Sequence, residues 1–169
     1  NYYRQLLRIL GSEKNDPSFA YGLYEDFAYL PVELYGDSLP TLEALYDLGF
    51  HLGIISNNSV TARRAIELHV GAFIERDHII ISEELGVHKP AKTIFLRAIA
   101  ALGVRAENCA YVGDNLEVDA IGAVQNGGYR LGVWIDRSEG TKQNLSFPQG
   151  VVRISSLAEV IKTIAEHEE

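Results

Sequence analysis

The sequence predicts an α/β protein built on a doubly wound parallel sheet. From Ser38 onward, short apolar runs alternate with segments of helical periodicity, which is the pattern of right-handed βαβ units. Glycines follow most of the helical segments, and helices commonly end at such glycines. Small polar or acidic residues follow several of the apolar runs. In a parallel sheet these residues lie together at the carboxyl edge, where ligands bind.

Residues 40–48 are expected to form the first helix of this core. Three leucines at helical spacing lie on one face of the segment, and Gly49 ends it. The apolar run 50–55 is typical of a strand buried on both faces. Residues 60–69 are then expected to form a second helix, which Gly71 ends.

The middle of the chain repeats this strand and helix alternation. The run 78–82 (HIIIS) predicts a second strand, and 91–102 predicts a helix that stops at a glycine. Residues 109–113 predict a third strand, and 116–126 predict a helix closed by a pair of glycines.

The last expected elements are a strand over 130–135, a short strand over 151–154 and a terminal helix over 157–167. Residues 1–35 differ in character, because they contain six of the nine tyrosines and read as helix followed by a linker. We therefore expect them to stand apart from the sheet.

The composition excludes several classes of protein. The chain has 169 residues and a net charge of −8, so it offers no basic face for nucleic acid. No apolar run is long enough for a membrane span, and no signal peptide opens the chain. One cysteine allows no internal disulfide, which favours a reducing, cytoplasmic location. The chain begins with Asn1 and contains no methionine, so its natural start is not in view.

The first candidate site follows the strand over 50–55. Ser56 and Asn57 offer a hydroxyl and backbone N–H groups near a helix N-terminus, which is a suitable seat for an anion. The same residue types also serve as ordinary turn or N-cap residues.

The second candidate is Lys89, which Pro90 follows at the entry to the next helix. A lysine in this position can neutralise a phosphoryl oxygen as a point charge. The alternative is a solvated surface lysine. The adjacent His88 is interpreted as a loop histidine.

The third candidate is Asp114, which ends the strand over 109–113, together with Asp119 in the first turn of the next helix. Two carboxylates at a strand end suit Mg²⁺, which prefers oxygen ligands. The alternative is an N-cap aspartate with a second acid near the helix dipole. The three sites follow successive strands, and this order makes chance agreement improbable.

These residues resemble the motifs of the haloacid dehalogenase (HAD) superfamily, whose members are mostly phosphatases. Ile54-Ile55-Ser56-Asn57 is similar to the second motif, and Lys89-Pro90 to the third. Gly113-Asp114 with Asp119 matches the fourth motif, GDxxxxD. The stretch 36–45 resembles the return from a helical cap into the core. The resemblance thus implies part of a cap over 1–35 and a Rossmann-like core over 36–169.

The resemblance also implies a function, a Mg²⁺-dependent phosphomonoester hydrolase that works through an aspartyl-phosphate intermediate. Ser56 and the Asn57 backbone would bind phosphoryl oxygens, Lys89 would hold the phosphoryl group and the nucleophile, and Asp114 would bind Mg²⁺ with support from Asp119. The substrate would be a small phosphorylated metabolite. The dehalogenases of the family lack the Gly-Asp pair, so Gly113-Asp114 favours phosphoryl chemistry.

The sequence departs from the family in one respect, because it contains no DxD motif after a buried strand. The nucleophilic aspartate is therefore expected upstream, on a strand that would lie between the strands over 50–55 and 109–113. That segment could also exist as a separate piece. This chain alone is expected to be inactive. The alternatives are a non-catalytic phosphate-binding or scaffold module and a phosphomutase of the same family.

Overall fold

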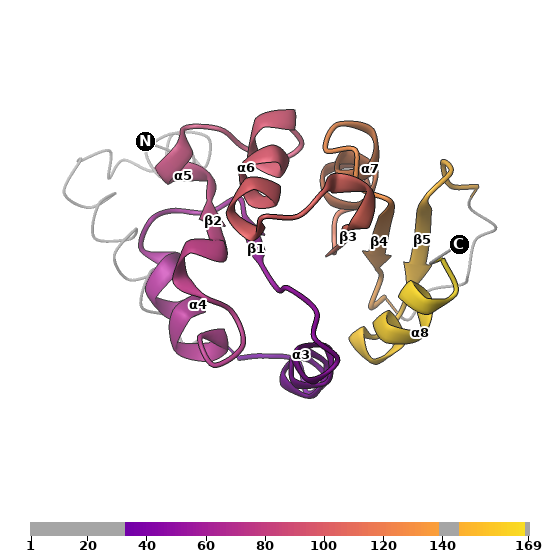
Figure 1. The fold of residues 1–169 in the computed structure, drawn as a ribbon, viewed down its shortest axis with the longest axis horizontal. Helices are drawn as coiled ribbons and strands as arrows, with labels where there is room; N and C mark the ends of the chain where they lie inside the picture. The colour runs from indigo at the N-terminus through magenta and orange to yellow at the C-terminus, as the bar shows by residue number, and fades with distance from the viewer. Residues whose placement is uncertain (1–32, 139–145, 168–169) are drawn as a thin grey trace, which may run out of the picture. The chain divides into compact units, whose positions relative to one another are not determined.

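The computed structural model describes residues 33–138 and 146–167 (Figure 1). Residues 34–169 form one compact unit. The expected cap over 1–35 falls almost wholly outside the described residues. Within the described ranges, no helix is long and apolar enough to cross a membrane.

In the described part of this unit, five parallel strands alternate with helices, which confirms the predicted α/β class. The strands are β1 (Ile54–Ser56), β2 (Ile79–Ile81), β3 (Ala110–Gly113), β4 (Leu131–Ile135) and β5 (Val151–Ile154). The α-helices are α3 (Ser38–Asp47), α4 (Ala62–Val70), α5 (Ser82–Leu85), α6 (Lys92–Leu102), α7 (Gly122–Gln125) and α8 (Val160–Ala165). A π-helix occupies Leu116–Ile121, and short 3₁₀ turns cover Arg76–His78, Ala106–Asn108 and Leu157–Glu159.

The strands form two parallel sheets rather than one continuous sheet. β1 pairs with β2 in one of them, and β3, β4 and β5 pair in that order in the other. Among the described residues, no ladder joins β1 to β3. These are the two strands between which the family resemblance places the first strand of a HAD core.

The first strand is shorter than the sequence predicts. β1 begins at Ile54 instead of Phe50, and Phe50 is exposed. The reason is the partner strand, because β2 has only the three residues Ile79–Ile81 and each pairs with one residue of β1. The expected second strand ends at Ile81 for a related reason, since Ser82 begins helix α5.

The expected helix over 116–126 is divided in two. It opens as a π-helix and continues as α7 from Gly122. The π-helix packs closely against β4 at Gly132. A Cβ atom at this position would lie 2.1 Å from the Ala120 carbonyl oxygen, so only glycine fits there. Short π-helical segments are frequent at functional sites.

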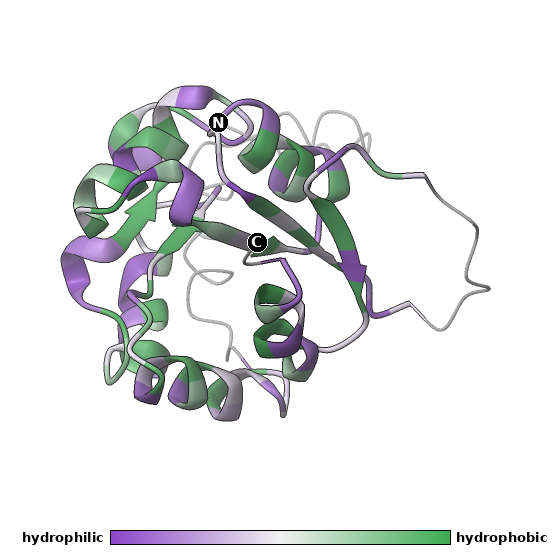
Figure 2. Ribbon diagram, turned by 45° about the vertical axis from the view of Figure 1, so that its right-hand side comes forward, coloured by the Kyte–Doolittle hydropathy of each residue, from purple (hydrophilic) through white to green (hydrophobic). Residues whose placement is uncertain are grey.

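Side chains of alternate strand residues pack on opposite faces of the sheets, as a doubly wound fold requires. Ile80 packs in a cluster with Phe95 of α6, whereas Ile79 and Ile81 pack with Val70 of α4. A third cluster joins β4 to α3 and α8, and it contains Leu45, Leu131, Val133 and Val160. Figure 2 shows largely hydrophobic strands and helices that carry both hydrophobic and hydrophilic residues.

Candidate active site

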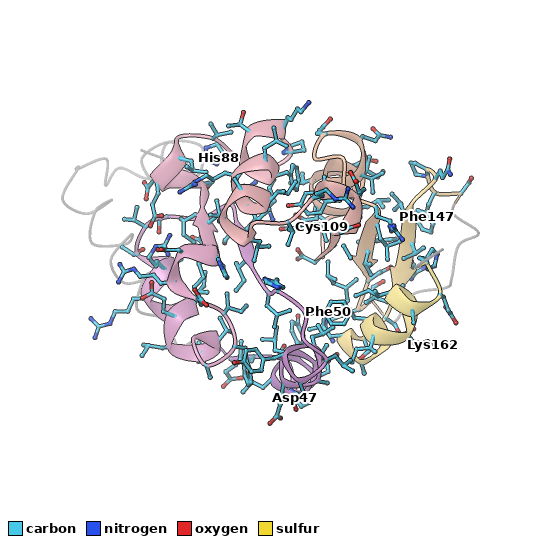
Figure 3. All side chains as sticks on the ribbon, viewed as in Figure 1. Asp47, Phe50, His88, Cys109, Phe147 and Lys162 are labelled. Atoms are coloured by element: carbon cyan, nitrogen blue, oxygen red, sulfur yellow. The ribbon has the colours of Figure 1, made fainter. Side chains whose placement is uncertain are left out.

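The predicted site residues lie at the ends of three different strands or in the segments that follow them, and Asp119 lies in the π-helix after β3. Ser56 is the last residue of β1, Asp114 directly follows β3, and Lys89 lies in the loop between α5 and α6. Figure 3 marks this loop at His88, the neighbour of Lys89.

Asn57 fixes the backbone of Lys89 through two hydrogen bonds. The Asn57 side chain donates from Nδ2 to the Lys89 carbonyl oxygen at 3.0 Å, and its Oδ1 accepts from the Lys89 backbone N–H at 2.8 Å. Neither Ser56 nor Asn57 caps α4, whose N-cap residue is Thr61. The paired amide therefore joins the tip of β1 to the loop that carries the lysine.

The Lys89 ammonium is largely shielded from solvent and paired, so it is not a solvated surface lysine. Its side chain is only 10% exposed, and Nζ donates to Asp119 Oδ1 at 2.7 Å and to the Tyr111 hydroxyl at 2.8 Å. An ammonium has three donors. Two are used within the described structure, which leaves one N–H for a ligand.

Asp119 is buried beneath the turn after β3, and both of its carboxylate oxygens accept hydrogen bonds. Oδ1 accepts from Lys89, and Oδ2 accepts from the Asn115 backbone N–H at 3.0 Å. Gly113 makes room for it, because a Cβ atom there would lie 2.4 Å from Asp119 Cβ. The N-cap of the following π-helix is Asn115, which accepts from Val118 N–H, so neither aspartate caps that helix.

Asp114 combines a fixed backbone with an open carboxylate. Its carbonyl oxygen accepts from the indole N–H of Trp134 at 3.0 Å, and the Arg153 guanidinium lies over that indole ring. Asp114 is exposed, and its carboxylate forms no hydrogen bond or ion pair with the described residues. The Ser56 hydroxyl likewise has no hydrogen-bond partner among the described residues. Both groups are therefore available to a ligand.

The residues present fit Mg²⁺ better than a metal that needs a full set of protein ligands. In residues 33–138 and 146–167, no three His, Cys, Asp or Glu side chains are grouped to hold a metal ion. Mg²⁺ commonly uses one or two carboxylates and takes its other ligands from water and substrate phosphates. Asp114 can supply such a carboxylate, whereas the oxygens of Asp119 are already engaged.

Sequence reasoning did not identify Tyr111 or Trp134 as part of this site. Tyr111 occupies a strand whose other residues are small or apolar, and its hydroxyl contacts Lys89. The sequence feature that could have identified Tyr111 is a tyrosine in an apolar strand, because a buried tyrosine hydroxyl usually has a hydrogen-bond partner. Burial, and then the negative charge of Asp119, raise the pKa of Tyr111 well above its usual value.

The chain is similar in sequence to curated phosphatases. The chain is 33% identical over 128 residues to a glyceraldehyde 3-phosphate phosphatase of Methanopyrus kandleri, and the match covers 75% of this chain and 55% of that protein. The chain thus spans about half the length of this curated relative.

Solved structures share the fold over nearly the whole chain. A HAD phosphatase from Thermococcus onnurineus superimposes with a TM-score of 0.70 at 28% identity, covering 98% of this chain and 80% of that one. A 2-haloacid dehalogenase from Pseudomonas syringae pv. Tomato superimposes with a TM-score of 0.73 at 26% identity, covering 97% and 68%. The family model for haloacid dehalogenase-like hydrolases matches residues 2–127. The chain therefore belongs to the haloacid dehalogenase-like hydrolase family.

Proposed function

We propose that the full-length protein is a Mg²⁺-dependent phosphatase that acts on a small phosphomonoester. The observation that carries this proposal is the buried Lys89 ammonium, which Asp119 holds and Asn57 ties to the tip of β1. An ammonium buried in this way is a fixed positive charge, which favours an anionic ligand beside it. The phosphatase relatives support the same reaction class.

Each candidate site residue has a separate role in binding a phosphoryl group. Lys89 donates its remaining N–H to one phosphoryl oxygen, and the unpartnered Ser56 hydroxyl donates to another. Asp114 holds Mg²⁺, and Asp119 supports the metal indirectly because its own oxygens are engaged. When bound, Mg²⁺ neutralises charge on the phosphoryl oxygens.

The nucleophile is the remaining requirement of a phosphoaspartyl route. We propose that an aspartate upstream of Asn1 supplies it, on a strand that pairs between β1 and β3. Among the described residues no ladder joins β1 to β3, which supports this arrangement. The open carboxylate of Asp114 favours phosphoryl transfer over the halide chemistry of the dehalogenase neighbour.

The test is hydrolysis of 4-nitrophenyl phosphate by the full-length protein, with Mg²⁺ and with EDTA. We expect Mg²⁺-dependent phosphate release, and Asp114→Asn should lower kcat/KM by about 100-fold because the metal loses its carboxylate. The matched control is Asp47→Asn, which removes an exposed carboxylate of α3 (Figure 3) and should change the rate less than about twofold.

Two results would reject the phosphatase assignment. One is full-length protein without Mg²⁺-dependent hydrolysis, which would favour a non-catalytic phosphate-binding module. The other is full activity in Asp114→Asn. Transfer of the phosphoryl group to a second position of a sugar phosphate, rather than to water, would instead identify a phosphomutase.

A further inference from the structure

Tyr111 places a polar group at the edge of an otherwise apolar cluster. Its ring packs edge-on against Phe95, with ring centroids 5.7 Å apart, and against Tyr129 at 6.2 Å. Packing of this kind fixes the direction of the ring. The hydroxyl at the end of the ring therefore has a defined position.

That hydroxyl links Lys89 to strand β1. It accepts a hydrogen bond from Lys89 Nζ at 2.8 Å and donates its own proton to the Ile55 carbonyl oxygen at 3.0 Å. The direction of both bonds is fixed, because an ammonium can only donate and a carbonyl can only accept. Ile55 directly precedes Ser56, so the chain of bonds ends at the residue before the candidate phosphate-binding serine.

The hydroxyl remains neutral at ordinary pH. Burial raises the pKa of Tyr111, and the nearby Asp119 carboxylate raises it further. Tyr111 therefore orients the ammonium without neutralising it, whereas Asp119 supplies the opposite charge.

We propose that Tyr111 is a positioning residue for the candidate phosphoryl site. Its hydroxyl and the Asp119 carboxylate together occupy two of the three Lys89 donors and so direct the third toward the ligand. This inference rests on the proposed phosphatase function. It adds a residue that the sequence motifs did not contain.

The chain supplies a matched control in Tyr129. This tyrosine belongs to the same aromatic group, and its hydroxyl also donates to a backbone carbonyl, that of Phe95 at 3.2 Å. Its hydroxyl contacts no described lysine. Tyr111→Phe and Tyr129→Phe each keep the ring and remove a hydroxyl that donates to a backbone carbonyl, but only the first removes a hydrogen bond with Lys89.

The experiment measures the lysine and the ligand separately in the full-length protein. The ¹⁵N NMR signal of the Lys89 ammonium, assigned with Lys89→Met, reports its hydrogen bonds through slow proton exchange. Calorimetric titration with inorganic phosphate in the presence of Mg²⁺ reports binding. We expect Tyr111→Phe to broaden the Lys89 signal and weaken phosphate binding about tenfold, as expected for loss of a hydrogen bond to a charged group. Tyr129→Phe should change neither.

Each other outcome has a defined meaning. An unchanged Lys89 signal and unchanged phosphate affinity in Tyr111→Phe would overturn the inference. Equal effects of the two variants would also overturn it, because they would show that loss of either hydroxyl disturbs the site without a specific contact to Lys89. If the unsubstituted protein binds no phosphate, the proposed function fails and the positioning role fails with it, while the Lys89 signal still decides whether the contact exists.

Discussion

Lys89 explains why so many polar groups gather at one strand tip. A buried ammonium is costly unless it is paired and hydrogen-bonded. Asp119 supplies the charge, Tyr111 supplies an acceptor, and Asn57 holds the backbone. All three residues therefore compensate the cost of shielding one ammonium from water. This arrangement indicates that the position of the Lys89 charge is important for the site.

Removal of the Asp119 charge alone should lower the free energy of unfolding more than removal of the Asp119 and Lys89 charges together. We expect Asp119→Asn to lower the free energy of unfolding by about 3 kcal/mol, because it leaves Lys89 buried without its counter-charge. Lys89→Met combined with Asp119→Asn should recover much of this loss. Urea denaturation of the two single variants and the double variant measures the coupling, and strictly additive effects would contradict the account.

A second carboxylate, Asp37, anchors the start of α3. It accepts two hydrogen bonds from Arg137, one from the Ser156 hydroxyl at 2.6 Å and one from the Leu157 N–H at 2.9 Å. The hydrogen bonds from Arg137 and then from Ser156 hold the pKa of Asp37 far below its usual value. The linker that enters the core is thus fixed to the residues that follow β4 and β5.

The Asp37 carboxylate makes the free energy of unfolding depend on pH under acidic conditions. Because the folded-state pKa lies below the unfolded value of about 3.9, the carboxylate stabilises the protein above that pH, and the stabilisation is lost as pH falls toward the folded-state pKa. We expect Asp37→Asn to lower the free energy of unfolding at neutral pH by about 1 to 2 kcal/mol and to make its decline below about pH 4 less steep. Chemical denaturation at several pH values measures both effects. Asp47→Asn is the control, and a parallel decline in the Asp37 variant and the unsubstituted protein would refute the anchor.

At the scale of elements, the π-helix after β3 depends on one glycine of β4. A Cβ atom at Gly132 would meet the Ala120 carbonyl oxygen at 2.1 Å, so the helix and strand would have to separate. We expect Gly132→Ala to cost about 3 kcal/mol of stability and to displace Asp119, which lies in the same helix. Gly36→Ala is the control, since a Cβ atom there meets nothing within 4 Å. Equal thermal stability of the two variants would contradict this role.

The sequence predicted the order of the elements better than their lengths. Alternation of apolar runs and helical segments was enough to identify all five strands. It could not show that β1 has three residues, because the ladder is limited by the length of β2. It also could not show that Asn57 and Tyr111 hold Lys89, because those contacts join residues 32 and 22 positions apart.

At the scale of the molecule, the main feature is the division between β1 and β3. Both strands carry a candidate site residue at or just after their carboxyl ends, and among the described residues no ladder joins them. Unpaired backbone groups at a strand edge inside a fold need hydrogen-bond partners, and a further strand can supply them. We expect the full-length protein to place one there and to bring its nucleophilic aspartate between Ser56 and Asp114.

The most direct test of the central claim is a crystal structure of the full-length protein with Mg²⁺ and inorganic phosphate. The account predicts a phosphate whose oxygens contact Lys89 Nζ and the Ser56 hydroxyl, with the metal on the Asp114 carboxylate. Phosphate bound elsewhere, with Lys89 enclosed by Asp119 and Tyr111 and no anion beside it, would contradict the account.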